Sequence, residues 1–340
     1  MGLSHQKHKG QNYAQVVFYF FLLFDIKTRS KGWLVRDTGS MLQENFSDLS
    51  FDEWLETINT YEDENCTVDF LGPDHAAILQ ESGKNLIVHF ENHQDINANW
   101  RGGRPLGWQL ASEAGWSSLS LVSRERSWFR DPYVYAYFDR LIDDGILDNF
   151  ENVVFYGKDA AAYSAAAYSV SAPMCRVLLI SPQATLDPER AGWDKRFVKQ
   201  RRQDFTSRFG YAPDMLASAE AATIIYDPKV PEEAMHVSLF HADNTKIYRM
   251  PFLSGHIEKI FLSQNLFKDV ILRINDGENA TKGFVDLLRR RRKYVNYYRI
   301  LLSTTDSMRR PYLSKLVCRA ALKVFRKPRF RKRLSELETL

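Results

Sequence analysis

Short apolar runs rich in β-branched and aromatic residues alternate with helical patterns through the middle of the chain. Such runs are typical of buried strands, and their alternation with amphipathic segments predicts a largely parallel sheet with helices on its faces. The strand candidates are residues 85–90, 117–122, 153–156, 176–180, 223–226 and 246–250. The hydrophobic pattern therefore predicts an α/β fold.

Helical patterns fill the stretches between these strand candidates. Residues 132–144 repeat apolar positions at helical spacing, and residues 160–171 form a small-residue helix that can pack close against a sheet. The charged segment 186–221 lies between two strand candidates and predicts a helical, cap-like insertion over the sheet edge. After residue 271 the strand signals stop, and two basic amphipathic helices are predicted over 283–302 and 311–325.

The most informative stretch is residues 153–169, where an apolar strand ends at a glycine and a small-residue helix begins within a few positions. This is the local pattern of a nucleophile elbow, Gly-x-nucleophile-x-Gly, whose central residue stands on a strained strand-to-helix turn. Small neighbours are required because the helix and the strand approach each other closely. Gly157, Asp159 and Ala161 occupy the three positions.

With this motif the chain resembles the α/β-hydrolase superfamily, and more narrowly an uncharacterised bacterial branch in which a degenerate elbow is followed by Tyr and repeated Ala. The resemblance covers about residues 85–275. It implies an α/β-hydrolase-like fold, with a mostly parallel sheet flanked by helices, and a triad in the order nucleophile, acid, histidine. The residues that match this order are Asp159, Asp227 after strand candidate 223–226, and His256 after strand candidate 246–250.

The resemblance also implies roles for these side chains and for nearby backbone groups. His256 is expected to accept a proton from the attacking group, while Asp227 orients its ring. The oxyanion donors are expected to be the backbone N–H of Ala160 and one from the loop after strand 85–90, near Phe90 and Glu91.

The central residue departs from the superfamily pattern, because Asp159 is neither serine nor cysteine. Three interpretations are open: a catalytically degenerate elbow, Asp159 as a carboxylate nucleophile, and a displaced site that uses Ser164 or other residues. Haloalkane dehalogenases and epoxide hydrolases use an aspartate nucleophile, but they usually carry Trp where this chain has Ala160. Ala161 replaces the second glycine and adds a methyl group where the helix crosses the strand.

Aromatic and basic residues interleave around the expected pocket. We expect Arg101, Trp128 and Arg130 to contact the substrate, with core packing of the aromatic residues as the alternative. His89 and His93 follow a strand instead of lying on a helix, which favours a structural role over metal binding. The chain contains no nucleotide-binding fingerprint and no zinc-type spacing, so the sequence predicts no cofactor and no metal.

The net charge of +4 hides a division of the chain. Residues 289–340, the basic tail, contain 17 Lys and Arg against 3 Asp and Glu, a balance of +14, and the remainder carries −10. The tail is expected to dock on the acidic surface of its own domain or to adsorb to an anionic membrane through residues 289–333. Nucleic-acid binding is the least favoured interpretation.

The cysteines and the apolar stretch near the N-terminus indicate the cellular compartment of the protein. Three separated cysteines fit a reducing cytoplasm, and the apolar run 16–24 is too short to span a bilayer. We therefore expect a cytoplasmic protein or one peripheral to the inner membrane. Proteins of this branch are sometimes labelled phosphoadenosine phosphosulfate reductases, but Cys318 lies within a predicted helix and has no partner cysteine for that chemistry.

The sequence predicts an N-terminal extension and helix at 1–59, an α/β-hydrolase-like domain at 60–280 and a basic helical extension at 281–340. The predicted function is that of a hydrolase-like protein, active or catalytically degenerate, that acts on or binds a carbohydrate-linked or other small ester. The alternative is a non-catalytic interaction protein on a hydrolase scaffold, peripheral to a membrane or to protein partners through its tail.

Overall fold

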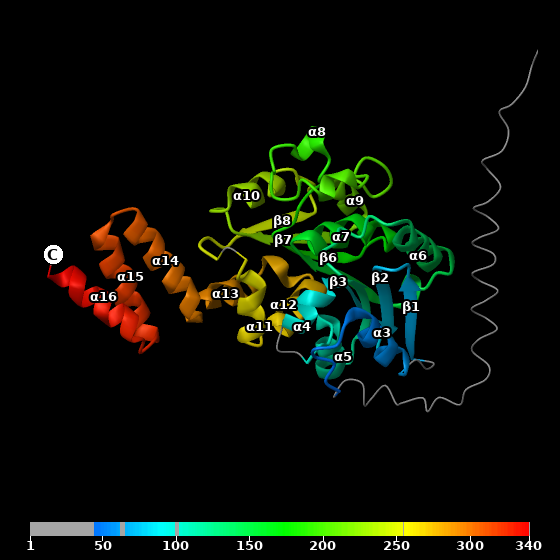
Figure 1. Ribbon diagram of the computed structural model, residues 1–340, viewed down its shortest axis with the longest axis horizontal. Helices are drawn as coiled ribbons and strands as arrows, with labels where there is room; N and C mark the ends of the chain where they lie inside the picture. The colour runs from blue at the N-terminus through cyan, green and yellow to red at the C-terminus, as the bar shows by residue number, and fades with distance from the viewer. Residues whose placement is uncertain (1–43, 62–64, 99–101, 254, 340) are drawn as a thin grey trace, which may run out of the picture.

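The centre of the molecule is an eight-stranded sheet in the order β1-β2-β4-β3-β5-β6-β7-β8 (Figure 1). This computed structural model describes residues 44–61, 65–98, 102–253 and 255–339. The strands are β1 (Cys66–Leu71), β2 (His75–Gln80), β3 (Asn85–Asn92), β4 (Ser117–Ser123), β5 (Asn152–Lys158), β6 (Arg176–Ile180), β7 (Ala221–Tyr226) and β8 (Thr245–Arg249). β2 runs antiparallel to both of its neighbours, and all pairings from β4 to β8 are parallel.

Apolar side chains leave both faces of the sheet. In β3, Val88 and Phe90 join the core on one face while Ile87 joins the core on the other, as the two-residue period of a strand requires. The first face is covered by α6 (Pro132–Asp143), α7 (Ala160–Tyr168), α9 (Ala212–Met215) and α10 (Pro231–Val237), and the second by α5 (Leu106–Ala114), α11 (Ile257–Ser263), α12 (Phe267–Asn275) and α13 (Lys282–Arg289). The predicted fold class, α/β-hydrolase-like with a mostly parallel sheet flanked by helices, is confirmed.

The edge of the sheet formed by β1 and β2 is covered by a third apolar cluster. α3 (Phe51–Asn59) starts with a capping box between Ser50 and Glu53 and buries Trp54 and Ile58 against β1 and β2. α4 (His93–Ala98) follows β3 directly and adds Ile96 to the same cluster. The β1–β2 hairpin, which the sequence analysis did not predict, therefore has a core of its own.

The segment between β6 and β7 lies over the first face but is mostly not helical, contrary to the prediction for residues 186–221. Its α-helices, α8 (Pro188–Ala191) and α9, are only four residues long. A fully buried hydrogen bond between the carboxylate of Asp194 and Nε2 of His236 in α10, 3.0 Å apart, ties the segment to the domain. Hydrogen bonds to the backbone and the capping of short turns replace the expected helices.

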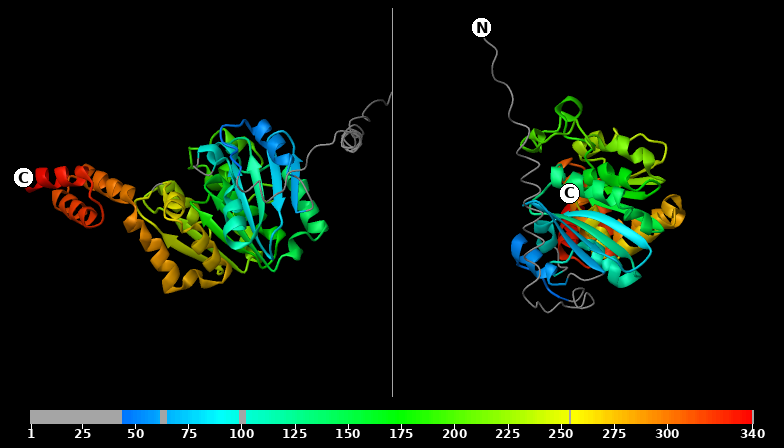
Figure 2. Two further views of the ribbon diagram at one scale, coloured as in Figure 1. Left: turned by 90° about the horizontal axis from the view of Figure 1, so that it is seen from below. Right: turned by 90° about the vertical axis from the view of Figure 1, so that its right-hand side faces the viewer.

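The basic tail forms a three-helix unit of α14 (Val295–Ser307), α15 (Pro311–Val324) and α16 (Pro328–Glu338). These helices extend away from the α/β domain (Figures 1 and 2) and pack on one another around Tyr298, Leu302, Cys318 and Phe330. The prediction that the tail docks on the domain's own acidic surface was therefore wrong. The ion pairs of Arg333 with Asp306 and of Arg319 with Glu338 join residues of the tail itself.

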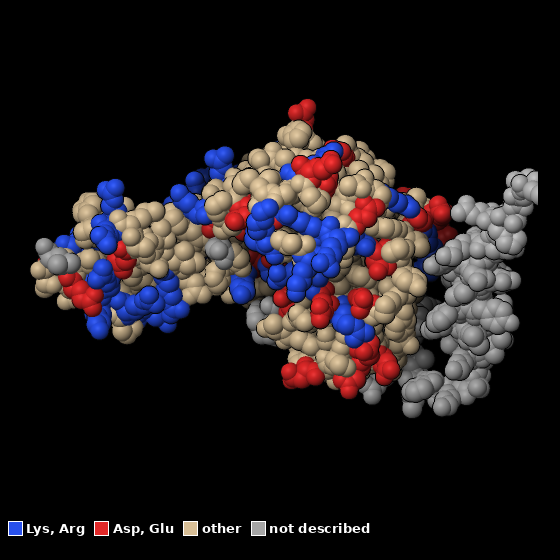
Figure 3. Space-filling view, turned by 45° about the horizontal axis from the view of Figure 1, so that its top comes forward, with Lys and Arg blue, Asp and Glu red and all other residues tan. Residues whose placement is uncertain are grey.

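Basic side chains remain on the surface of the tail and also gather over the middle of the α/β domain (Figure 3). In the described part of the chain, no helix combines the length and apolar composition needed to cross a bilayer. The apolar run 16–24 lies outside the described residues.

α7 passes close to β5 at Gly157, because a Cβ atom built there would lie 2.2 Å from the carbonyl oxygen of Ala161. We expect Gly157→Ala to lower the free energy of unfolding by about 3 kcal/mol, the upper end of overpacking costs. Denaturant unfolding followed by circular dichroism measures this loss.

Gly115→Ala is the matched control, since a Cβ there would meet no atom within 4 Å and only the left-handed backbone resists it. Its expected cost is about 1 kcal/mol. Equal losses for the two variants would contradict the close approach.

Candidate functional site

The turn after β5 holds Asp159 on a strained backbone. β5 ends at Lys158 and α7 begins at Ala160, and Asp159 between them has φ 54° and ψ −119°. Its N–H donates to the carbonyl of Ile180 in β6 at 2.9 Å, and its own carbonyl accepts from the N–H of Ala162 at 3.1 Å. Non-glycine residues rarely adopt this φ, and the surrounding sheet and helix hold it. The predicted strand–turn–helix at Gly157 and Asp159 is present.

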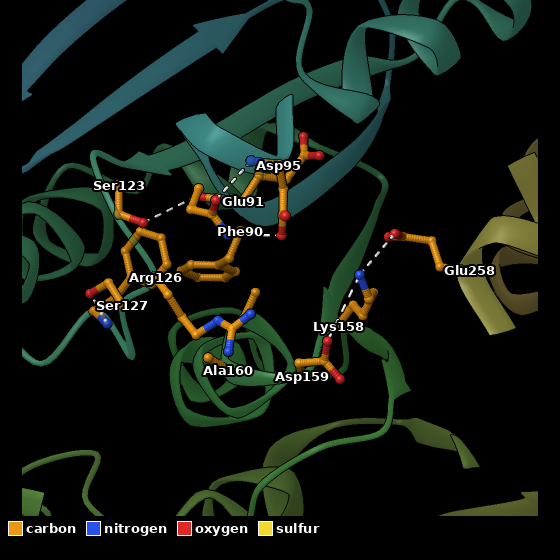
Figure 4. A pocket seen from close by; sticks show the side chains of 13 residues that line it. Phe90, Glu91, Asp95, Ser123, Arg126, Ser127, Lys158, Asp159, Ala160 and Glu258 are labelled. Carbon is orange, nitrogen blue, oxygen red and sulfur yellow. Dashed lines mark hydrogen bonds and ion pairs between the residues drawn. The ribbon is translucent and has the colours of Figure 1, made fainter. Parts of the chain in front are cut away.

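A small cavity opens beside this turn, at the carboxyl ends of β3, β4 and β5 (Figure 4). Its volume is about 40 Å³, enough for a few water molecules. Its lining is mostly polar and comes from four parts of the chain. The lining residues are Phe90, Glu91, Asn92, Asp95, Ser123, Arg126, Ser127, Phe129, Lys158, Asp159, Ala160, Ala161 and Glu258.

Lys158 connects two carboxylates across one wall of the cavity. Its Nζ lies 3.8 Å from Oδ2 of Asp159 and 3.5 Å from Oε2 of Glu258, which comes from α11. The hydroxyl of Tyr156 donates to the other oxygen of Glu258 at 2.5 Å. The charge of Glu258 raises the pKa of Lys158 to about 12, so Lys158 stays a cation at neutral pH.

The negative charge of Asp159 is less well compensated than that of Glu258. Burial raises the pKa of its carboxyl, an effect that the nearby charge of Lys158 opposes. Solvent still reaches 42% of its side-chain surface, so the carboxylate lies in a recess with one side open. A carboxylate of this kind is poorly solvated and available to a ligand in the cavity.

The opposite wall comes from the loop after β4. Arg126 extends across the cavity toward Ala160 (Figure 4), and Ser127 lies next to it. The hydroxyl oxygen of Ser127 lies 2.9 Å from Nε2 of His75, at the start of β2. The cavity therefore brings together a carboxylate, an ammonium, a guanidinium and a hydroxyl that contacts a histidine.

Asp227 and His256 do not line this cavity. The carboxylate of Asp227 accepts hydrogen bonds from the N–H groups of Lys229 at 2.8 Å and Leu253 at 2.6 Å. Nδ1 of His256 lies 3.4 Å from the hydroxyl of Tyr294, near the start of the C-terminal helices. Glu258, two residues after His256, occupies the cavity wall instead.

The three residues expected to form the oxyanion hole all line the cavity, but two of them lie in a strand and not in a loop. Ala160 is the first residue of α7. β3 continues to Asn92, so Phe90 and Glu91 lie inside the strand and not in the loop that the sequence analysis placed there. The carboxylate of Glu91 accepts the N–H of Leu106 at the start of α5, at 2.6 Å.

Two of the three residues expected to contact the substrate, Trp128 and Arg130, do not line the cavity. Trp128 is fully buried and packs edge-on against Phe197 of the segment over the sheet. Arg130 donates to the backbone carbonyl of Asp204 at 2.7 Å. Both therefore hold that segment in place, and Arg101 lies outside the described residues.

The other residues singled out in the sequence, Ser164, His89 and His93, are buried in the domain and do not line the cavity. Ser164 is fully buried within α7 and donates to the carbonyl of Ala160, so it does not reach the cavity. His89 is buried between β3 and β4, where Ser120 lies 2.9 Å from its Nε2. His93 packs against Trp54 and Phe51 in the third apolar cluster.

Sequence reasoning missed Lys158, Glu258, Ser127 and His75 as members of the site. Lys158 stands inside the motif Gly157-Lys158-Asp159, where its position beside the central residue was the available signal. Ser127 and Glu258 follow strand ends that the sequence did mark. His75 belongs to the unpredicted hairpin, so no signal pointed to it.

Comparisons with known proteins give no closer assignment. No family model matches the chain, and no curated protein is similar to it in sequence. Similar solved structures include Est1E from Butyrivibrio proteoclasticus, at 16% identity over 62% of this chain and 98% of that one, with a TM-score of 0.40. The Pyrococcus furiosus esterase Pf2001 has 13% identity over 67% and 95%, TM-score 0.39. The capsule O-acetyltransferase of Neisseria meningitidis serogroup A has 9% identity over 60% and 92%, TM-score 0.38. The fold is assigned on the sheet itself and not on these similarities.

The strained and poorly compensated position of Asp159 predicts that this residue lowers stability. Asp159→Asn removes the charge, and Asn tolerates positive φ. Because the folded-state pKa of Asp159 is raised, its ionisation destabilises the fold as pH rises above the unfolded value of 3.8. We expect the variant to melt at a higher temperature than the parent at pH 7 and at the same temperature at pH 3.

Thermal melts across this pH range measure the effect. Asp95→Asn is the control, because Asp95 lines the same cavity but does not have a positive φ. A parent protein as stable as Asp159→Asn at pH 7 would contradict the prediction.

Proposed function

We propose that the cavity beside Asp159 is the working site of a hydrolase-like protein that acts on or binds a small ester-type substrate, including carbohydrate-linked esters. The observation that carries the proposal is the backbone of Asp159. Positive φ in a residue with a Cβ costs of order 1–3 kcal/mol and is kept where function uses the strained geometry.

The chemistry of the recess supports a role for Asp159 itself. Its carboxylate is partly exposed and faces the cavity, so it can attack an electrophilic carbon or position a water molecule. Lys158 and Arg126 are cations beside it and can stabilise negative charge that develops on a substrate oxygen. The helix α7 adds the N–H groups of its first turn, which begins at Ala160.

The proposal does not use His256 or Asp227 in proton transfer, since neither lines the cavity. Within the lining, proton transfer falls to groups nearer the turn. The substrate class follows from the polar lining and from the resemblance described for the sequence.

Turnover of p-nitrophenyl acetate, an acetylated sugar, an epoxide and a haloalkane tests the proposal. We expect Asp159→Asn to lower kcat/KM at least about 100-fold for the substrate that is turned over. His256→Ala is the matched control, with an expected change of less than about twofold, because its ring faces Tyr294.

Equal turnover in the parent, Asp159→Asn and His256→Ala would remove the catalytic part of the proposal. Binding of the same compounds, measured by calorimetry, then decides whether the cavity is a binding site without catalysis. No heat of binding to the parent protein would remove the binding part as well.

The outer face of α15 favours a second function, attachment to an anionic membrane. Ser314, Cys318 and Ala321 face the small core of the tail, so the opposite side of the helix points outward. That side carries exposed apolar residues: Tyr312 at 69%, Leu313 at 43%, Leu316 at 43% and Val324 at 50%. Arg319 and Lys323 are exposed at the same helical spacing. An apolar stripe with basic neighbours is the composition of helices that lie in a membrane interface.

Vesicle co-sedimentation tests this surface. We expect binding to phosphatidylserine-containing vesicles, weak binding to phosphatidylcholine alone, and release by added salt. Leu316→Glu should weaken binding at least about tenfold, the equivalent of one apolar side chain withdrawn from the interface. Ile142→Glu, at an exposed apolar position of α6, is the control and should bind as the parent does. Equal binding by the two variants would contradict the role of α15.

A further inference from the structure

A serine of the cavity wall contacts a histidine from a strand that is distant in the sequence. β2 runs opposite to its neighbours, so its first residue, His75, lies at the edge where the parallel strands end. Ser127 lies in the loop that leaves β4 at that same edge. Ser127 lines the cavity, and its hydroxyl oxygen lies 2.9 Å from Nε2 of His75, which is not itself a lining residue.

The hydrogen bonds around Ser127 direct its proton. The backbone N–H of Phe129 donates to the hydroxyl oxygen at 2.8 Å, and Phe129 is held at φ 53°. One lone pair of the oxygen is thus occupied, and in the tautomer of His75 that carries its proton on Nδ1 the hydroxyl donates to Nε2. Ser123, the other serine of the lining, donates instead to the backbone carbonyl of Glu125 at 2.7 Å.

His75 has the surroundings of a neutral base. It is only 7% exposed, and burial lowers its pKa, so the ring is uncharged at neutral pH. Phe129 packs on the ring at 5.2 Å between centroids. Asp74 and Asp131 are the charged groups that act on it, and both favour the imidazolium that forms when it takes a proton. Within the described residues, Nδ1 makes no hydrogen bond.

We propose that Ser127 is a nucleophile of this site and that His75 is its general base. This inference rests on the proposed ester chemistry and assigns its attacking group. The Ser127 oxygen bonds to the ester carbonyl carbon while its proton passes to Nε2 of His75. His75 then returns that proton to the departing alkoxide as the carbon–oxygen bond breaks. Water hydrolyses the acyl-serine and restores both groups.

The remaining lining residues fit this assignment. Asp159, on the facing wall, positions the water for the second step, and Arg126 beside Ser127 stabilises the oxyanion. The site is therefore displaced from the elbow position to the loop after β4. The strained turn at Asp159 and the first turn of α7 still form one wall of the cavity.

A fluorophosphonate probe tests the assignment on the full-length protein. The Ser127 oxygen would bond to phosphorus, fluoride would leave, and the proton would pass to His75. Peptide mass spectrometry is expected to find the adduct on Ser127. Ser127→Ala should abolish labelling, and His75→Gln should slow it at least about 100-fold. The control Ser112→Ala, at an exposed serine of α5 that does not line the cavity, should label as the parent does.

The outcomes separate this inference from the function on which it rests. No adduct on Ser127 in the parent protein, or labelling of His75→Gln at the parental rate in a variant with an unchanged circular dichroism spectrum, would overturn it. Turnover of p-nitrophenyl acetate that is lost in Asp159→Asn but kept in Ser127→Ala would support the proposed function and overturn the inference. An adduct on Ser127 without turnover of any ester would support Ser127 as the nucleophile and His75 as its base, and would contradict the proposed ester turnover.

Discussion

The close contact between α7 and β5 is the constraint on which the rest of the site depends. The carbonyl of Ala161 lies where a Cβ of residue 157 would be, so the helix can cross the strand only above a glycine. Alanines over most of α7 allow the same proximity along its length, against β3, β5 and β6. The chain must then reverse within one residue, and Asp159 takes the positive φ that this reversal requires.

That reversal decides what the cavity contains. The first turn of α7 and the ends of three strands meet at one edge, so the side chains that leave these ends converge on a small volume. Six of the thirteen lining residues are charged, and their charges are paired only in part. Lys158 pairs with Glu258, and the charge of Glu258 stabilises the ammonium form of Lys158. For Asp159, burial is the largest influence on the pKa of the carboxyl.

The basic tail is a second unit with a different physical basis. Its three helices bury a few apolar residues among themselves and carry most of their charge outward. Such a small core leaves one side of α15 without a partner in the described structure, and Leu316 and Tyr312 remain exposed there. The charge division seen in the sequence therefore corresponds to a spatial division between the α/β domain and the tail (Figure 1).

The sequence by itself determined the parallel strands, the small-residue helix and the turn at Asp159, because each depends on local periodicity and on glycine and alanine at close contacts. It did not show the β1–β2 hairpin, whose second strand carries no polar alternation, since all six of its residues are buried.

Only the tertiary structure decided which side chains share the cavity. His75 contacts the lining residue Ser127 because β2 runs in reverse. Glu258 lines the cavity in place of His256 because positions two apart at a helix start point in nearly opposite directions. Strand direction and the rotation of a helix about its axis are set by packing between distant segments, which local sequence patterns do not record.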